Sequence, residues 1–252
     1  QSVDSSIDLQ ISDPNKVDFT EISGLGFSPT LTGPSGKPII YIVNDGGGGR
    51  RFGIYDSGTG IRLLSLRMPR SLTLALDWES ISVGSCGGAN ASSSCIYIAD
   101  VGDNVALDTG GTRTQHKERP GYPLYKVKEP YYIDFADNDV LPESYVTTLW
   151  FNYFHATSPT RYSDCEATLV DSVGWGQDGA PGDLYIVTKW GWDSGLTRLF
   201  KIPARIWSQA KADGSFVYSP RAVGNYSAIN GLSGVTWTRA ESTLDGTVIA
   251  LG

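Results

Sequence analysis

The chain has little methionine, histidine and cysteine: one, two and three residues respectively among 252. Its two histidines, His116 and His155, do not have the short spacing of a zinc site, so no zinc centre is expected. No stretch approaches the roughly 18 consecutive apolar residues of a membrane-spanning helix, so no membrane span is expected. The chain also lacks a run of Lys or Arg and carries a net charge of -7, which argues against a nucleic-acid surface.

A pattern that occurs three times is the main feature that is present. In each copy an acidic residue opens an apolar strand, and a Tyr-Ile strand follows about twenty residues later. The copies are Glu21-Ile-Ser-Gly-Leu with Tyr41-Ile-Val-Asn-Asp, Asp77-Trp-Glu-Ser-Ile with Tyr97-Ile-Ala-Asp, and Asp164-Cys-Glu-Ala-Thr with Tyr185-Ile-Val-Thr-Lys. Internal repeats of this kind are typical of radial or linear arrays.

Two more strand candidates follow in each copy. The third strands begin at Arg51, Tyr122 and Thr197, and the fourth strands are Arg62–Arg67, Tyr145–Phe151 and Ser215–Tyr218. Four short antiparallel strands per unit predict the blades of an all-β β-propeller. The predicted units lie near 18–70, 71–152, 160–220 and 228–252, and residues 1–17 are expected to be an N-terminal arm or a ring-closing strand.

The predicted units amount to about three and a half blades, which cannot close a ring. Natural propellers have about four to eight blades, and an unclosed one exposes strand edges that invite pairing with another chain. We expect either a fragment of a six- or seven-bladed ring or a ring that another chain completes, with self-assembly through an open blade edge as one route.

Cysteine and asparagine patterns bear on the compartment. Cys86 and Cys95 flank a loop between two predicted strands, and a hairpin there would place them within disulfide reach. Cys165 fits either a small buried side chain or a reactive thiol. Two glycosylation sequons begin at Asn90 and Asn225, and together with the disulfide they predict a secreted, extracellular glycoprotein.

The strand-opening acids predict a calcium site. If the first strand of each blade is innermost, Glu21, Glu79 and Glu166 converge on the central channel, and like charges held together favour a bound cation. Ca²⁺ accepts six to eight oxygen ligands. Further oxygens at the strand ends come from Asn44, Asp45, Asp100, Asp103 and Asn104. Both sets also have a simpler interpretation. The strand-end residues would form turns that hydrogen-bond their own backbone, and the strand-opening acids would be hydrated or hydrogen-bonded.

Signals for other chemistry are weak. Trp190 and Trp192 are separated by one glycine after a predicted strand, which is compatible with sugar stacking but is more typical of packing between blades. No Gly-x-Ser-x-Gly nucleophile elbow is present.

These motifs resemble those of a family of secreted, largely uncharacterised β-propellers. The matching segments are Glu21-Ile-Ser-Gly-Leu, Asp77-Trp-Glu-Ser-Ile, Tyr97-Ile-Ala-Asp-Val-Gly-Asp-Asn, Asp164-Cys-Glu-Ala-Thr and Tyr185-Ile-Val-Thr-Lys. The chain departs from the pattern at Ser80, Ala99 and Cys165. More distantly it is similar to calcium-dependent propeller lactonases and esterase-like phytase domains, which implies a metal-bearing propeller but no settled activity.

The primary hypothesis is therefore a calcium-binding propeller that serves as an extracellular binding or structural module, with protein or glycan partners at a cell surface or matrix. One alternative is a metal-dependent hydrolase of the lactonase or phosphoesterase type, in which the ion polarises an ester or phosphate oxygen. A weaker alternative is a lectin. The absence of a recognisable nucleophile or base favours the non-enzymatic interpretation.

Overall fold

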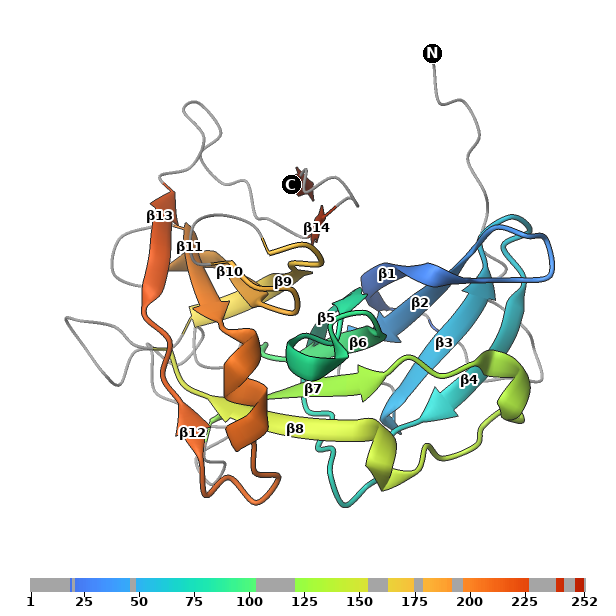
Figure 1. The fold of residues 1–252 in the computed structure, drawn as a ribbon, viewed down its shortest axis with the longest axis horizontal. Coiled ribbons are helices and arrows are strands. Elements are labelled where there is room, and N and C mark those ends of the chain that lie inside the picture. The colour runs from blue at the N-terminus through green and yellow to red at the C-terminus, as the bar shows by residue number, and fades with distance from the viewer. Residues whose placement is uncertain are drawn as a thin grey trace, which may run out of the picture.

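Nearly all regular structure in the chain is β-strand, as the repeat pattern predicts (Figure 1). The computed structural model describes residues 19, 21–45, 49–102, 121–153, 163–174, 179–191, 197–226, 239–242 and 248–251, and for some of these the backbone alone. The described strands form three sheets of four or five strands and one two-stranded hairpin. The predicted arm over residues 1–17 lies outside the described residues.

Strands that follow one another in sequence are neighbours in each sheet, which is the up-and-down order of a propeller blade. The first sheet contains β1 (Ile22–Thr32), β2 (Pro38–Asn44), β3 (Arg51–Asp56) and β4 (Arg62–Arg67). The second contains β5 (Trp78–Ser85), β6 (Ser94–Asp100), β7 (Tyr122–Lys128), β8 (Val146–Phe151) and, beside β8, the short β12 (Val217–Tyr218). The third contains β9 (Ser163–Val170), β10 (Leu184–Gly191), β11 (Thr197–Ile202) and β13 (Ala222–Tyr226). The hairpin pairs β14 (Arg239–Ser242) with β15 (Val248–Leu251).

The first strands of the sheets lie next to one another. β1 contacts β5, β5 contacts β9, and β9 contacts β14. In Figure 1 these four strands gather near the middle of the view, whereas β4, β8 and β13 lie towards its rim. A Cβ on Gly24 of β1 would lie 2.6 Å from the backbone nitrogen of Ile81, so glycine permits this close approach. Four-stranded antiparallel sheets with adjacent inner strands make the fold a partial β-propeller, which confirms the predicted fold class.

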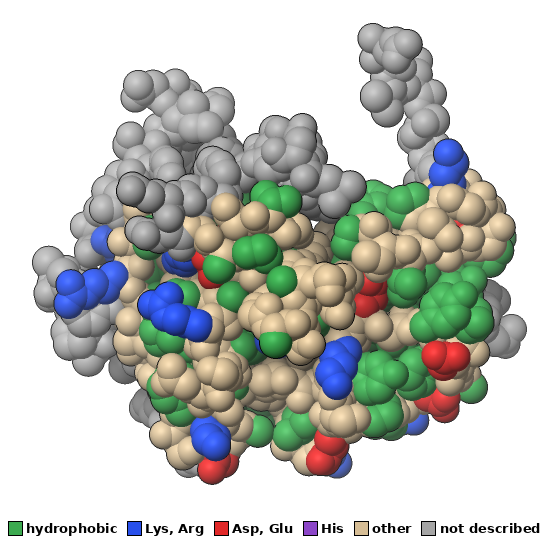
Figure 2. Space-filling view, in the orientation of Figure 1, with side chains coloured by type: hydrophobic (Ala, Val, Ile, Leu, Met, Phe, Trp, Pro, Cys, Tyr) green, Lys and Arg blue, Asp and Glu red, His purple; other side chains and the backbone are tan. Residues whose placement is uncertain are grey.

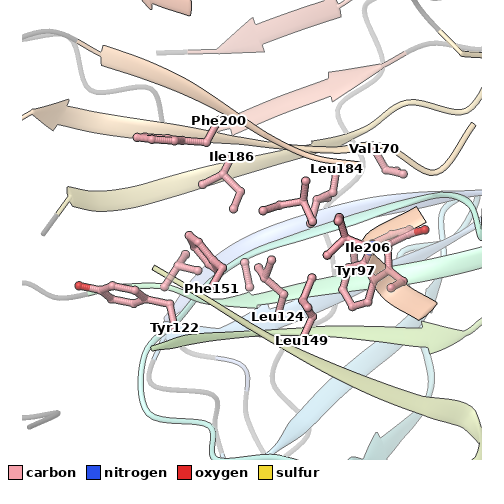
Figure 3. Close-up of a cluster of buried hydrophobic side chains, with 14 of the residues drawn as sticks. Tyr97, Tyr122, Leu124, Leu149, Phe151, Val170, Leu184, Ile186, Phe200 and Ile206 are labelled. Carbon is pink, nitrogen blue, oxygen red and sulfur yellow. The ribbon is translucent and has the colours of Figure 1, made fainter. Parts of the chain in front are cut away.

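Alternate side chains of a strand pack against the sheets on its two sides. On β6, Ile96 and Ile98 belong to the core shared with the first sheet, whereas Tyr97 and Ala99 belong to the core shared with the third. Figure 3 shows the second of these cores, where side chains of the third sheet face those of the second. The period of two along the strand is what buries both faces of the middle sheet.

The fourth strand of the third sheet is not where the sequence predicts it. Within the predicted strand Ser215–Tyr218, two residues form β12, but they pair in parallel with Trp150 and Phe151 of the second sheet. The indole nitrogen of Trp150 also donates a hydrogen bond to the carbonyl oxygen of Ala212, at 3.0 Å. The fourth strand of the third sheet is instead β13, which pairs with β11. The prediction is wrong because strand propensity does not specify which sheet edge a segment joins.

Short 3-10 helices lie between the strands. They are η2 (Gly88–Asn90), η3 (Tyr132–Asp134), η4 (Glu143–Tyr145) and η5 (Ala204–Gln209). The η5 residue Trp207 packs on the second sheet, with its ring centroid 5.6 Å from that of Tyr97. None of the helices in the described ranges is long and apolar enough to cross a membrane. On the face shown in Figure 2, basic and acidic side chains are scattered rather than gathered by sign.

The disulfide predicted between Cys86 and Cys95 is present. Cys86 directly follows β5 and Cys95 is the second residue of β6. Their Cα atoms are 4.9 Å apart, and the bond closes a loop across nine positions of sequence that contains η2. Cys165, the remaining cysteine, is fully buried in β9. Its position supports the interpretation of Cys165 as a small buried side chain.

Replacement of both Cys86 and Cys95 by serine is expected to lower the free energy of unfolding by about 2–3 kcal/mol, because the bond limits the freedom of a short loop in the unfolded chain. For a chain of this size the melting temperature should fall by roughly 5–10 °C. Thermal unfolding without reductant checks this, and an unchanged melting temperature would show that the bond does not hold the hairpin.

Candidate functional site

Three carboxylates come together at one end of the first two inner strands. Asp45 directly follows β2, Asp77 directly precedes β5, and Glu79 is the second residue of β5. Each has a carboxylate oxygen within 4.8 Å of the other two. Asp45 is exposed, Asp77 is half-buried and Glu79 is buried. We call these three residues the acidic group. An arrangement of hard oxygen donors from two sheets is suited to a divalent cation.

A β-bulge at the start of β5 sets the direction of the Glu79 side chain. Trp78 pairs with Asp100 and Ser80 pairs with Ala99, so Glu79 is an extra residue in the ladder. A bulge bends the strand locally and turns its side chains, and bulges are enriched beside functional sites. Glu79 therefore turns towards the strand end that also bears Asp77.

The same bulge occurs in β1 and β9, the first strands of the first and third sheets. The extra residue is Ser23 in β1 and Glu166 in β9. Counted from the bulge, Glu21 occupies the position that Asp77 has in the second sheet, and Glu79 corresponds to Ser23. The first sheet thus has serine where the other two have glutamate.

Asp100 fixes the segment that precedes β5. Its carboxylate accepts hydrogen bonds from the backbone nitrogens of Leu76 and Asp77, at 3.1 and 2.8 Å, and from the Tyr125 hydroxyl at 3.1 Å. Burial and the nearby Asp100 charge raise the pKa of Tyr125 well above its ordinary value, which keeps this hydroxyl a donor. Asp100 therefore positions the backbone of Asp77, and its predicted role as a metal ligand stays a prediction.

Gly102, just after β6, leaves space beside the acidic group. Its backbone nitrogen donates to the carbonyl oxygen of Asp77, at 3.2 Å. A Cβ at this position would clash with Oδ2 of Asp77 and Oε1 of Glu79, so these two oxygens converge on the bare face of the glycine. Any other residue at position 102 would occupy the place where the carboxylates meet.

Two further predicted residues, Glu21 and Asn44, have backbone next to the acidic group but do not contribute a carboxylate to it. Glu21 is exposed, and its carbonyl oxygen accepts a hydrogen bond from the backbone nitrogen of Asp45 at 2.8 Å. Within the described residues its carboxylate is not part of the acidic group. Asn44 is buried opposite Ile22, and its Oδ1 has no hydrogen-bond partner among the described residues.

The remaining predicted residues are only partly covered. Asp103, Asn104 and Trp192 lie outside the described residues, and the structure describes only the backbone of Glu166, Trp190 and Asn225. Asn90 is exposed at the end of η2. Their predicted roles as ligands, sugar contacts and glycosylation sites stay predictions.

Asp77 is the member of the acidic group that sequence reasoning did not name as a ligand. The signal for it is the Asp-x-Glu spacing of Asp77 and Glu79, because residues two apart on a strand face the same side. The bulge adds to this signal, but no sequence pattern shows it directly.

A groove of about 590 Å³ lies between the first sheet, the disulfide loop and β7. Within it, Glu129 joins the first two sheets by accepting hydrogen bonds from the hydroxyls of Thr30 and Tyr41, both at 2.9 Å. Lys126 also lines the groove, with Nζ 3.4 Å from the carbonyl oxygen of Cys86 and 5.0 Å from the ring centroid of Trp207. Burial lowers the pKa of Lys126 to about 8.

This lowered pKa predicts a pH dependence of stability. Lysine in an unfolded chain titrates near pH ~10.4, so between about pH 8 and that value the unfolded state binds more protons than the folded state. The contribution of Lys126 to the free energy of unfolding therefore rises with pH across this window. Urea unfolding at about pH 7.5 and 9.5 should show the native chain gaining stability relative to Lys126→Met.

Lys128→Met, which removes an exposed lysine of the same strand, is the matched control. Equal pH dependence of the native chain and Lys126→Met would contradict the assignment.

Comparison with known proteins identifies no family. No protein-family model matches the chain, and no curated protein matches it. Among solved structures, the chain is similar to the Dos1 propeller, with a TM-score of 0.37 and 11% identity over 91% of this chain and 42% of that chain. It is also similar to hydrazine synthase of Kuenenia stuttgartiensis, with a TM-score of 0.35 and 10% identity over 87% and 69% of the two chains.

The chain thus spans less than half the length of the Dos1 propeller chain. Likenesses this weak carry no argument about function, and the description of the chain as a partial propeller comes from its own sheets.

Proposed function

We propose that this chain is a calcium-binding part of a secreted β-propeller that serves as an extracellular binding or structural module. The observation that supports the proposal most directly is the acidic group, formed by Asp45, Asp77 and Glu79, whose carboxylate oxygens lie within 4.8 Å of one another.

The donor set favours calcium over softer or smaller metals. All three side chains offer oxygen, which hard cations prefer. Softer metals prefer thiolate ligands, but Cys86 and Cys95 form a disulfide and Cys165 is buried in β9. Ca²⁺ tolerates irregular geometry and accepts both carboxylate and carbonyl oxygens, whereas Mg²⁺ demands a near-ideal octahedron. Carboxylates held this close repel one another, and a divalent cation relieves that repulsion.

The location of the acidic group favours a structural ion. Asp45 belongs to the first sheet, and Asp77 and Glu79 belong to the second. An ion held by all three would link two neighbouring blades, between the end of β2 and the start of β5. Binding would therefore stabilise the contact between blades, which is the use expected in a rigid binding or structural module.

Secretion is supported by the disulfide between Cys86 and Cys95, since such bonds persist mainly in oxidising compartments. The sequon asparagine Asn90 is exposed in the loop that this disulfide closes, where a glycan has room. Protein or glycan partners at a cell surface or matrix follow from this location and belong to the same proposal.

Calcium titration of the metal-free chain is expected to show saturable binding that Asp77→Asn and Glu79→Gln each weaken by at least ~10-fold, because each removes a charged ligand. With calcium at about 100 times its Kd, linkage predicts a stabilisation of about 2.7 kcal/mol, or roughly 5–10 °C in melting temperature. Isothermal titration calorimetry and thermal unfolding measure the two effects.

Asp134→Asn, which neutralises an exposed acid of η3 outside the acidic group, serves as the control and should bind calcium as the native chain does. If Asp134→Asn weakened calcium binding equally, the effect would reflect the net charge of the chain and not the acidic group. The absence of saturable binding at millimolar calcium would contradict the proposal.

A further inference from the structure

A second cavity of this chain is lined by arginine. It has a volume of about 430 Å³ and lies where β3 begins and β4 ends, on the first sheet. Four arginines line it, namely Arg50, Arg51, Arg67 and Arg70, and the apolar side chains of Met68 and Val140 contribute the rest of its side-chain lining. No acidic residue of the described part of the chain lines the cavity. Four cations gathered in one place are unexpected in a chain of net charge -7.

The backbone places two of these arginines directly opposite each other. Arg51 of β3 and Arg67 of β4 are cross-strand partners in the antiparallel ladder. Like charges in this position are destabilising. The preceding residue, Arg50, has φ of 65°, a left-handed conformation that is uncommon for a long side chain, and its carbonyl oxygen accepts a hydrogen bond from Met68 at 2.8 Å. The fold therefore brings like charges together, and an anion would compensate them.

Hydrogen-bond donors in the cavity remain available. The Nε of Arg51 is buried and has no hydrogen-bond partner in the described part of the chain. Arg67 donates from Nε to the carbonyl oxygen of Asn138 at 2.8 Å, and that bond fixes the side chain. Among the described residues its terminal nitrogens make no ion pair with a carboxylate. A buried donor without an acceptor calls for an explanation, and a bound ion is one of the usual ones.

Two acidic residues close in sequence to Val140, Asp137 and Asp139, bond to groups outside the cavity. Asp137 forms an ion pair with Arg62, at 3.4 Å, and accepts a hydrogen bond from the backbone nitrogen of Ser65 at 2.8 Å. The carboxylate of Asp139 accepts a hydrogen bond from the backbone nitrogen of Ala136, at 2.8 Å. Among the described residues, neither forms an ion pair with an arginine of the cavity.

From this arrangement we propose that the arginine cavity binds a ligand that carries two or more sulfate or phosphate groups. Planar guanidinium groups donate in pairs to the oxygens of such groups and remain charged at every physiological pH. A multiply charged ligand matches four arginines better than a single carboxylate does. The cavity volume lies within the range of about 300–1,000 Å³ that small-molecule sites occupy.

The test is calorimetric titration of the full 252-residue chain with sulfate, pyrophosphate and citrate. Saturable binding of pyrophosphate, tighter than that of sulfate, is expected, and Arg51→Gln and Arg67→Gln should each weaken it by about 10-fold or more. Arg70→Gln, at an exposed position where folding is not at risk, should weaken it less but measurably. Arg205→Gln removes the same charge from exposed η5 and should leave binding unchanged.

Three outcomes would overturn the proposal. They are no saturable binding of sulfate or pyrophosphate up to millimolar concentration, equal weakening by Arg205→Gln, and binding of citrate alone. Thermal unfolding gives a second readout, because the bound anion should raise the melting temperature of the native chain and of Arg205→Gln more than that of Arg51→Gln.

Discussion

Close approach of the inner strands β1, β5 and β9 is the constraint on which the rest of the structure depends. It needs a glycine at Gly24, where a Cβ would meet the backbone of Ile81, and it is fastened by hydrogen bonds between strands of different sheets. Ser23 donates to the carbonyl oxygen of Trp78 at 2.6 Å, and the hydroxyls of Ser80 and Thr168 lie 2.9 Å apart. These buried hydroxyls are therefore paired across the sheets, which lets the inner strands lie close together.

The acidic group follows from the same constraint. When β1 and β5 lie side by side, the end of β2 and the start of β5 are brought to one place, so Asp45 meets Asp77 and Glu79. The bulge at Glu79 and the bare backbone of Gly102 then leave room between their oxygens. The arginine cavity depends instead on the outer half of the first sheet, where the β3–β4 ladder sets Arg51 against Arg67. One blade therefore contributes to two sites of opposite charge.

Much of the fold could be predicted because strand periodicity and hairpin spacing are local signals. The four strands of the first sheet and the disulfide between Cys86 and Cys95 belong to this class. The swap of β12 to the second sheet could not be predicted, since the choice of edge depends on tertiary packing such as the Trp150 bond to Ala212. Ser80, a departure from the pattern of the resembling family, proves to be an inter-sheet contact.

The candidate site was predicted only in outline for a related reason. Glu79 and Asp45 were named from their positions at strand ends, but Asp77 was not, because the bulge that turns Glu79 beside it arises from pairing register. Glu21 was grouped with Glu79, although the register aligns it with Asp77. A single residue of offset in a strand reverses the side on which a carboxylate lies, and sequence spacing alone does not give that offset.

The most direct test of this account is a double-mutant cycle between the second and third sheets, using Ser80→Ala, Thr168→Val and both changes together. A coupling free energy of about 1 kcal/mol is expected from urea unfolding, since the two hydroxyls bond each other across adjacent inner strands. Strict additivity, within about 0.3–0.5 kcal/mol, would contradict the side-by-side placement of β5 and β9.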